Sequence, residues 1–362
     1  MAPGIYFGLA DDVYHADPSL GSHSVARLRY SGPHYWWESW MNPLREEKKE
    51  SDAYIWGRAF HKLTLEGRSA FDESFARAPV IDEYPGCCRI VDDIKAKLAA
   101  LGLPVSGNKA VLIERLKAAD PEATFWDEIV AAAEAGGKTL LKPGMHAEIL
   151  LSGAMISKNP HLQPSFRDGF SEVSVFWVED GVPCKARIDY LKLKATVDLK
   201  SILTNRDDLT FDRLVHRAIA MYRYDMQCAH YQTARDMARQ FVTEGKVFDM
   251  TGGRTLEHYD EDTGEIVQRP TMPTQKWLNV FAKTTDFTWV WVMFGKGGPP
   301  LAKGYEFRRD DPAFDLACDD RKRGLKTYTE FYERFGREMW LVMDPVELVT
   351  GQDLPSWLGN AA

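Results

Sequence analysis

The strongest constraint on the fold of this chain is the stretch 171–202, in which apolar side chains recur with a period of two. Its sequence, SEVSVFWVEDGVPCKARIDYLKLKATVDLKSI, predicts three strands at about 172–178, 183–191 and 195–202. The segment Glu-Asp-Gly predicts a hairpin turn between the first two strands, and Lys-Leu-Lys separates the last two. We therefore expect an antiparallel meander within the core.

The last strand of this meander carries an acid and a base on one face. Residues i and i+2 of a strand point the same way, so Asp198 and Lys200 share a side of the sheet. Asp189, near the end of the preceding strand, can lie beside Asp198 across a tight turn. Carboxylates buried side by side are unfavourable unless a cation lies between them, and Lys200 balances only one of the two. A divalent metal ion would resolve this conflict, although a structural ion pair or solvent-facing charges remain the alternatives.

Segments outside the meander have the patterns of further helices and strands. Helical periodicity predicts a helix that Gly32-Pro33 ends, a buried helix in 51–67 that carries His61, one long helix over 211–241 and a late helix over 325–340. The segment 276–294 resumes strand character.

The residue pattern of 86–140 differs from that of the flanking segments. Two short amphipathic helices, at about 91–101 and 109–118, are joined by Gly-Leu-Pro-Val-Ser-Gly-Asn, which supplies a helix stop, a linker and an N-cap. The predicted core of this unit is Leu98, Leu101, Leu112, Ile113 and Leu116. We expect this insertion to divide a larger unit into residues 1–85 and 141–346, with an irregular tail at 347–362.

Composition limits the class of protein. Apolar residues make up 44% of the chain and charged residues 27%, which is typical of a globular protein with a substantial core. No apolar run approaches the roughly 20 residues needed to cross a bilayer, and Asp11 and Asp12 stand where a signal peptide would be apolar. Five cysteines without a repeated spacing favour free thiols in a reducing cytoplasm. The net charge of -8 argues against a general nucleic-acid coat but not against a DNA enzyme with a local basic groove.

An acid followed by acid-x-lysine on adjacent strands resembles the PD-(D/E)xK nuclease superfamily, and other motifs point to its RecB- and RecE-like branches. The segment WGRAFHKLTLE is similar to their upstream helix, whose histidine corresponds to His61. The segment YDMQCAHYQTA has their Q-x-x-x-Y pattern at Gln227 and Tyr231. The opening GIYFGLADDVYHADPSLGSHSVARLRYSGPHYWW is similar to the start of phage RecE-like (exodeoxyribonuclease VIII-type) proteins. The resemblance covers most of residues 1–300 in the same order.

This resemblance implies a fold and an activity. The fold would be α/β (α+β), with a restriction-endonuclease-like core in which a central mixed sheet is flanked by helices, and with a small helical insertion. The activity would be that of a metal-dependent exodeoxyribonuclease that degrades linear duplex DNA from 5′ to 3′. Its 3′ single strands would serve a RecT-type annealing protein in phage-type recombination, in the cytoplasm of a bacterial host. A ring-shaped homo-oligomer is known in this group.

The resemblance also implies roles for the acid and lysine residues. Asp189 would bridge metal ions, Asp198 would be a second ligand aided by the Leu199 carbonyl, and His61 would complete one coordination sphere. Lys200 would position or deprotonate the attacking water or steady the phosphate charge. Hard oxygen ligands suit Mg²⁺ or Mn²⁺, and two ions are expected.

Three further residues are candidates for the same site. Gln227 and Tyr231 would hold the DNA backbone or orient the ligands, with ordinary helix polarity and core packing as the alternative. Glu172, on the first strand of the meander, is an additional candidate, and an edge-strand residue facing solvent is the other interpretation.

DNA contacts are expected in two places. The resemblance implies a 5′-phosphate pocket in the N-terminal segment, with Ser24, Arg27 and Ser31 as candidate donors. An arginine and hydroxyls near a helix suit an anion, and an ordinary surface position of Arg27 is the alternative. The insertion resembles a SAP-like DNA-binding module, and a small helical hairpin with a solvated basic face is its alternative. Its candidate phosphate contacts are Lys95, Lys97, Lys109, Arg115 and Lys117.

Other functions remain open at this point. The chain could be an endonuclease or a 3′-directed nuclease of the same fold, or a DNA-binding protein that retains the fold without catalysis. The absence of a GxxxxGK[ST] segment excludes a self-contained helicase–nuclease.

Overall fold

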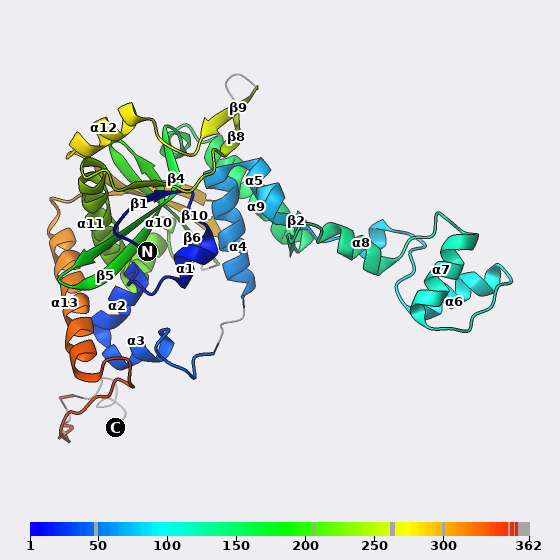
Figure 1. Cartoon of the computed structure of the whole chain (residues 1–362), viewed down its shortest axis with the longest axis horizontal. Coiled ribbons are helices and arrows are strands. Elements are labelled where there is room, and N and C mark those ends of the chain that lie inside the picture. The colour runs from blue at the N-terminus through cyan, green and yellow to red at the C-terminus, as the bar shows by residue number, and fades with distance from the viewer. Residues whose placement is uncertain are drawn as a thin grey trace.

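The computed structural model is built around a seven-stranded mixed sheet with the strand order β11-β10-β6-β5-β4-β1-β7 (Figure 1). It describes residues 1–46, 50–205, 208–260, 265–298, 301–346, 348–350 and 352–353. The strands of the sheet are β1 (Gly4–Phe7), β4 (Gly169–Glu179), β5 (Val182–Lys192), β6 (Ala195–Leu203), β7 (Val247–Asp249), β10 (Thr288–Lys296) and β11 (Leu301–Phe307). β4, β5 and β6 form the predicted antiparallel meander, and β10 joins β6 in parallel.

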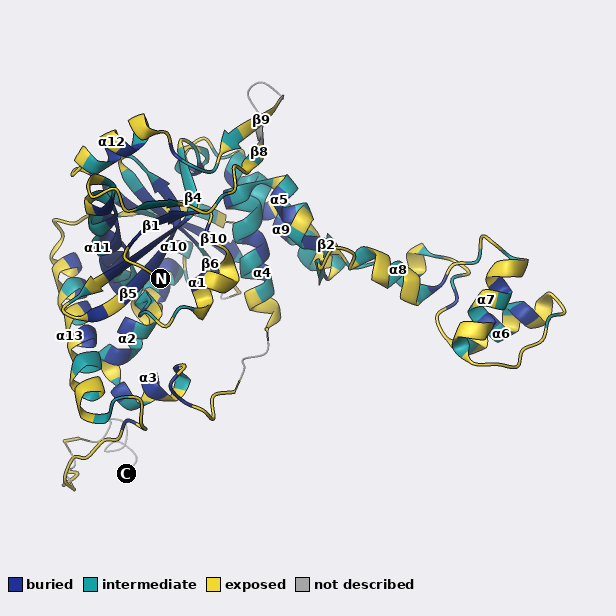
Figure 2. Cartoon of the chain, in the orientation of Figure 1, coloured by how far each residue is buried: buried dark blue, intermediate teal, exposed yellow. Residues whose placement is uncertain are grey.

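Two core clusters cover the two sides of this sheet. The helices of the first cluster are α2 (Ser22–Tyr30), α3 (Gly32–Glu38), α10 (Phe211–Tyr222), α11 (Tyr224–Thr243), α12 (Gln275–Lys283) and α13 (Pro312–Phe335). Those of the second are α4 (Asp52–His61), the π-helical turn η1 (Lys62–Glu66), α5 (Arg68–Ser74), α9 (Pro143–Ser157) and the short η3 (Gln163–Phe166). Along β10, Trp291 and Met293 belong to the first cluster and Val292 and Phe294 to the second, so the strand is buried on both faces. Figure 2 shows the resulting buried centre of the sheet. This arrangement confirms the predicted fold class.

The turn between β4 and β5 has the geometry that its sequence predicts. Asp180 and Gly181 both have positive φ, 49° and 80°, as in the primed turns that match the twist of a hairpin. The gap between β5 and β6 is only two residues, so these strands are joined by the expected tight turn.

The ladder between β4 and β5 is interrupted at Glu172 and Asp189. Regular pairs stand on either side of the interruption, Ser171↔Tyr190 and Val173↔Ile188. Glu172 has a φ of 53°, a left-handed conformation that is uncommon for a side chain of this size. Residues two apart in a strand normally face the same side of the sheet, but Ile188 packs in the first core cluster and Tyr190 in the second. The alternation of β5 side chains between the two faces therefore shifts at Asp189. This local break directs Glu172 and Asp189 toward the same space.

The prediction of one helix over 211–241 is wrong. The chain forms α10 and α11, separated by Arg223 in a left-handed conformation with φ 54° and ψ 46°. The Arg223 guanidinium donates to Asp225 at 3.0 Å, to Asp320 at 2.8 Å and to the hydroxyl of Tyr30 at 2.8 Å. These tertiary contacts fix the break, because the segment contains neither glycine nor proline there.

The strand character predicted for 276–294 is wrong in its first half. Residues up to Lys283 form α12, whose N-cap Thr274 accepts a hydrogen bond from the backbone N–H of Trp277 at 3.3 Å. The alternating apolar run that follows forms β10.

Two predicted helix boundaries also change. Gly32 and Pro33 begin α3 as well as following the end of α2, because proline fits the first turn of a helix. The late helix, α13, begins at Pro312 and ends at Phe335, where Gly336 adopts a φ of 57°.

The predicted insertion forms a separate small core. Its helices are α6 (Val91–Ala100), α7 (Lys109–Ala119) and α8 (Trp126–Ala133), and Figure 1 shows them away from the central sheet, beyond the short parallel pair β2 (Phe75–Arg77) and β3 (Thr139–Leu141). The buried residues of this core are Cys88, Ile94, Leu98, Leu112, Leu116 and Phe125, with Ile113 packed against them. Leu101 is instead 50% exposed, because it lies beyond the last turn of α6. The exact limits of the insertion stay a prediction.

The C-terminal tail and the possibility of a membrane-spanning helix also belong to the sequence predictions. Most of the predicted tail, 347–362, lies outside the described residues. No helix in the described ranges combines the length and apolarity that a bilayer crossing requires.

Candidate metal centre

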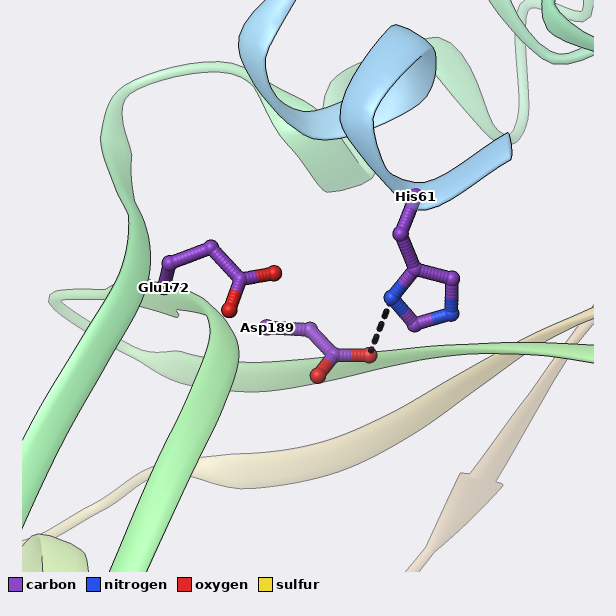
Figure 3. A group of neighbouring side chains, drawn as sticks. All are labelled: His61, Glu172 and Asp189. Carbon is purple, nitrogen blue, oxygen red and sulfur yellow. Dashed lines mark ion pairs between the residues drawn. The ribbon is translucent and has the colours of Figure 1, made fainter. Parts of the chain in front are cut away.

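His61 reaches the sheet from the end of a buried helix. Ser51 caps the start of α4 by accepting a hydrogen bond from the backbone N–H of Tyr54, and Trp56 and Phe60 anchor the helix in the second core cluster. His61 is its last residue and leads directly into η1, a π-helical turn of a kind that is frequent at functional sites. Figure 3 shows its imidazole pointing toward the interrupted part of the β4–β5 ladder.

His61, Glu172 and Asp189 form a potential metal site. The imidazole Nδ1 of His61 lies 3.7 Å from Oδ2 of Asp189 (Figure 3). Ligand atoms of all three residues lie within 4.8 Å of one another. Adjacent ligands of an octahedral ion with bonds of about 2.1 Å are about 3 Å apart and opposite ligands about 4 Å. Separations of up to 4.8 Å exceed these spacings only slightly, so small side-chain movements would bring the three donors onto one divalent cation, and their chemistry suits Mg²⁺ or Mn²⁺.

Burial and the nearby charge of Asp189 raise the proton affinity of the Glu172 carboxylate. Burial, followed by the negative charge of Asp189, raises the pKa of Glu172 to about 8, against the opposing effect of Arg187. Burial lowers the pKa of His61, while Asp189 acts in the opposite direction. The imidazole is thereby kept in the neutral form that binds metals. A bound cation would remove the repulsion between the carboxylates.

Asp198 and Lys200 lie beside this cluster on β6. The ladder pair Tyr190↔Val197 sets Asp189 opposite Asp198 where the two strands begin to separate. Asp198 is fully buried, and its Oδ1 and Oδ2 lie 2.8 Å and 2.7 Å from Nζ of Lys200. Burial raises the pKa of Asp198 to about 7, although Lys200 acts in the opposite direction. The role of Asp198 as a metal ligand stays a prediction, because His61, Glu172 and Asp189 are the three brought within reach of one ion.

The backbone of β6 supports the same cluster. The N–H of Leu199 donates to Oδ2 of Asp189 at 2.8 Å. A backbone hydrogen bond with Leu199 also raises the pKa of His61, against the larger effect of burial. The predicted coordination by the Leu199 carbonyl stays a prediction.

Gln227 and Tyr231 approach the site from α11. The Gln227 amide donates to Oδ1 of Asp198 at 3.1 Å, so Gln227 orients this carboxylate. Tyr231 is 9% exposed and packs edge-on against Trp289 with ring centroids 5.8 Å apart. Burial raises the pKa of Tyr231 well above its usual value, and a hydrogen bond with Gln227 lowers it. Gln227 thus contacts the Asp198–Lys200 pair, whereas the burial of Tyr231 against Trp289 agrees with the alternative of core packing, and the roles of both residues stay predictions.

Arg187 is a site residue that the sequence reasoning missed. Its Nε lies 3.2 Å from Oε2 of Glu172, and its two other guanidinium nitrogens contact the Asp11 carboxylate and the Leu9 carbonyl. Arg187 thus ties the N-terminal segment to the metal cluster. The signal was present, because Arg187 stands two residues before Asp189 on the same strand.

The cluster opens into a cavity of about 2160 Å³. Its walls come from α4, η1 and α5, the N-terminal segment, and the hairpin of β8 (Thr255–Asp260) and β9 (Glu265–Pro270). His61, Glu172, Asp189 and Arg187 all line it. This volume exceeds the usual range for small-molecule sites of about 300–1,000 Å³ and can admit part of a polymer.

The residues predicted to bind a 5′-phosphate are not among those lining this cavity. Arg27 pairs with Glu38 at 3.1 Å. The hydroxyl of Ser31 caps α3 by accepting from the N–H of His34 at 3.3 Å, and Ser24 is half-buried on α2. Their role in DNA binding stays a prediction.

Most of the predicted cationic contacts of the insertion take part in local interactions. Lys109 and Lys117 of α7 pair with Asp127 and Glu128 of α8. The ammonium of Lys95 lies 3.8 Å from the carboxylate of Asp92. The guanidinium of Arg115 donates to the backbone carbonyls of Pro104 and Ser106. Lys97 has no carboxylate within 4 Å in the described part of the chain.

Comparison with known protein families identifies the insertion. The SAP domain family matches residues 89–121, which confirms the predicted SAP-like module. The chain is also similar to the crystal structure of a protein from Eubacterium rectale that bears the provisional name exonuclease, with 14% sequence identity and a TM-score of 0.42, over 89% of this chain and 87% of that chain. No curated protein matches the sequence.

Proposed function

We propose that this chain is a metal-dependent nuclease that hydrolyses DNA phosphodiesters. The observation that carries the proposal is the meeting of His61, Glu172 and Asp189 in the wall of a large cavity, with the buried Asp198–Lys200 pair on the neighbouring strand. Arg187 pairs with Glu172 and Lys200 pairs with Asp198, so Asp189 is the carboxylate that a divalent cation would balance. The SAP module adds a second contact surface for DNA.

Each side chain of the site has a proposed role in hydrolysis. His61, Glu172 and Asp189 hold a divalent cation, and Asp198 is the ligand predicted to join them. Such an ion supplies charge neutralisation at the phosphate and lowers the pKa of water. Lys200, held by Asp198, would steady a phosphoryl oxygen or orient the attacking water. Gln227 keeps Asp198 in place through its amide.

The resemblance of the sequence extends the proposal to direction and product. The enzyme would be an exonuclease on linear duplex DNA, acting from 5′ to 3′ and leaving 3′ single strands for recombination. The SAP module would hold the duplex through phosphates without reading its sequence, which suits an enzyme that moves along any DNA. A RecT-type annealing protein, a ring of identical subunits and action in the cytoplasm of a phage-carrying bacterium belong to the same proposal.

A cleavage assay tests the reaction. Linear duplexes labelled at the 5′ or 3′ end, and closed circular duplexes, are incubated with Mg²⁺, Mn²⁺ or EDTA. Degradation of linear DNA alone, with metal alone, supports the exonuclease, and early release of the 5′ label supports the proposed direction. Cutting of circles would indicate an endonuclease, and early release of the 3′ label a 3′-directed enzyme.

Two variants separate catalysis from binding. Asp198→Ala and Lys200→Ala are expected to abolish cleavage while DNA binding persists. Binding by the unmodified chain without any turnover would instead favour a non-catalytic DNA-binding protein. Cleavage that survives Asp198→Ala would remove this residue from the site.

A further inference from the structure

A row of tyrosines leads from Lys200 to the surface of the molecule. Nζ of Lys200 lies 5.5 Å from the ring centroid of Tyr224, the first residue of α11. The rings of Tyr224 and Tyr222 have centroids 5.6 Å apart at an angle of 31°. Tyr224 is half-buried, whereas Tyr222 is 64% exposed. The row therefore connects the candidate site with open solvent, and it does not line the large cavity on the His61 side.

Arg223 fixes a second exposed ring beside this row. Its guanidinium donates to the hydroxyl of Tyr30 at 2.8 Å and lies 5.9 Å from the centre of that ring. Tyr30 is 67% exposed. The left-handed backbone of Arg223 is a conformation that proteins retain where the surroundings enforce it, often at functional positions. It separates Tyr222, the last residue of α10, from Tyr224, the first residue of α11.

The exposed face of α10, the helix that ends at Tyr222, carries positive charge. Arg217 lies one helical turn before Met221, with its Nε 3.5 Å from Sδ of that residue, and Arg213 lies a further turn back. Both arginines are exposed, and neither has a carboxylate within 4 Å among the described residues. Unpaired guanidinium groups beside exposed apolar side chains favour a polyanion over an apolar protein partner.

We infer that Tyr222 and Tyr30 are stacking platforms for the unpaired bases of a single-stranded nucleic acid, whose phosphates follow Arg217 and Arg213 along α10. Aromatic rings combined with a cationic track are the general means of binding single strands without sequence preference. The inference rests on the proposed function in one respect: the bound strand is the one that is engaged at Asp198 and Lys200.

Binding of a single strand tests this surface without requiring catalysis. The probe is a fluorescein-labelled (dT)20 oligonucleotide in EDTA, and a closed circular duplex serves as the comparison. Tyr222→Ala and Tyr30→Ala are expected to weaken (dT)20 binding by roughly 5- to 150-fold per lost stacking contact, with little effect on the circular duplex. Tyr222→Phe keeps the ring and should bind normally. Leu316→Ala, which removes a side chain that is 68% exposed on α13, is the matched control and should also bind normally.

Two further readouts distinguish stacking from a general loss of structure. A 2-aminopurine base within the oligonucleotide is quenched when it stacks, and Tyr222→Ala should abolish part of this quenching. The double variant Arg213→Ala/Arg217→Ala should reduce the slope of log affinity against log salt by about 1.4, because each phosphate contact to a single strand contributes about 0.7.

Unchanged (dT)20 affinity in both alanine variants would overturn the inference. An equal loss of circular-duplex binding, or the same loss in Leu316→Ala, would overturn it as well. The outcome is independent of cleavage: weakened (dT)20 binding in a protein that cuts no DNA would contradict the proposed nuclease and leave this surface supported.

Discussion

At the scale of residues, Glu172 gives the site its third donor. Its left-handed φ of 53° interrupts the β4–β5 ladder and turns its carboxylate toward Asp189 and His61. A backbone conformation of this kind, in a residue other than glycine, is maintained only when contacts such as the 3.2 Å ion pair with Arg187 hold it. The metal site therefore depends on a local irregularity of the sheet.

Replacement of Glu172 should weaken metal binding. Glu172→Gln removes one anionic ligand and is expected to lower the affinity for Mn²⁺ by at least about tenfold, as measured by titration calorimetry. Asp72→Asn is the matched control, because Asp72 lines the same cavity but pairs with Arg68 at the surface. Equal Mn²⁺ affinity in the unmodified chain and Glu172→Gln would exclude Glu172 as a ligand.

Metal affinity should also rise with pH. The pKa values of Glu172 and Asp198, raised by burial to about 8 and about 7, mean that both carboxyls carry protons in the metal-free protein at pH 6. A cation must displace these protons, so Mg²⁺ affinity should increase from pH 6 to pH 9 with release of protons. Calorimetry in buffers of different ionisation enthalpy measures that release, and a pH-independent affinity without it would contradict the assignment.

The same groups determine how the metal-free protein responds to pH. A carboxyl whose folded-state pKa is raised binds more protons when folded, so its contribution to stability is full below about pH 4 and is lost as pH rises to about 8. In EDTA, the melting temperature should therefore fall between pH 5 and pH 8, whereas the increase caused by Mg²⁺ should grow. A melting temperature that rises over this range in EDTA would show that other groups dominate.

At the scale of elements, the helix junction at Arg223 has a testable energetic signature. Arg223→Ala loses three hydrogen-bond partners and leaves a left-handed alanine, whereas Arg223→Gly loses the same partners without the steric penalty. The free energy of unfolding should fall in both, and by about 1 kcal/mol more in the alanine variant. Urea denaturation measures the difference, and a glycine variant less stable than the alanine variant would contradict the conformation of this junction.

The elements that local pattern defines were predictable from the sequence. The meander lies within a few residues of its predicted limits, because alternating apolar side chains and the Asp180-Gly181 turn specify it locally. The break at Arg223 was not predictable, because it depends on Asp320 and Tyr30, which are 97 and 193 residues away in the chain. Distant contacts override local helical periodicity at this position.

The candidate site was predictable to a similar extent. The pairing of Asp198 with Lys200 follows from strand geometry, and the approach of Asp189 follows from the short turn. The arrival of His61 depends on packing of α4 against the sheet, which only the family resemblance indicated. The position of Glu172 depends on an interruption of the ladder that no residue pattern specifies.

At the scale of the whole molecule, the SAP module and the central sheet are separate cores. The module buries its own cluster, and the chain leaves and re-enters the main body at the adjacent strands β2 and β3, where the N–H of Ala78 donates to the carbonyl of Leu141 at 2.8 Å. Removal of the module should therefore leave the central sheet and the metal cluster intact.

A deletion tests this separation. Replacement of residues 86–136 by a short Gly/Ser linker is expected to preserve cooperative melting and Mn²⁺ affinity while weakening binding to closed circular duplex DNA. Lys97→Ala in the full chain is a milder variant that removes a cation with no carboxylate within 4 Å among the described residues and should produce part of the same loss. Full duplex affinity after the deletion would show that the module does not contribute to DNA binding.

The central claim is that His61, Glu172 and Asp189 together hold a divalent cation. Anomalous diffraction from a crystal soaked in Mn²⁺ tests it most directly, because the ion is located without reference to activity. We expect an anomalous peak about 2.0–2.3 Å from the imidazole Nδ1 of His61 and from one oxygen each of Glu172 and Asp189. The peak should lie between these three ligand atoms, which are within 4.8 Å of one another. A fully soaked crystal with Mn²⁺ only on other carboxylates, and none between these three residues, would contradict the account.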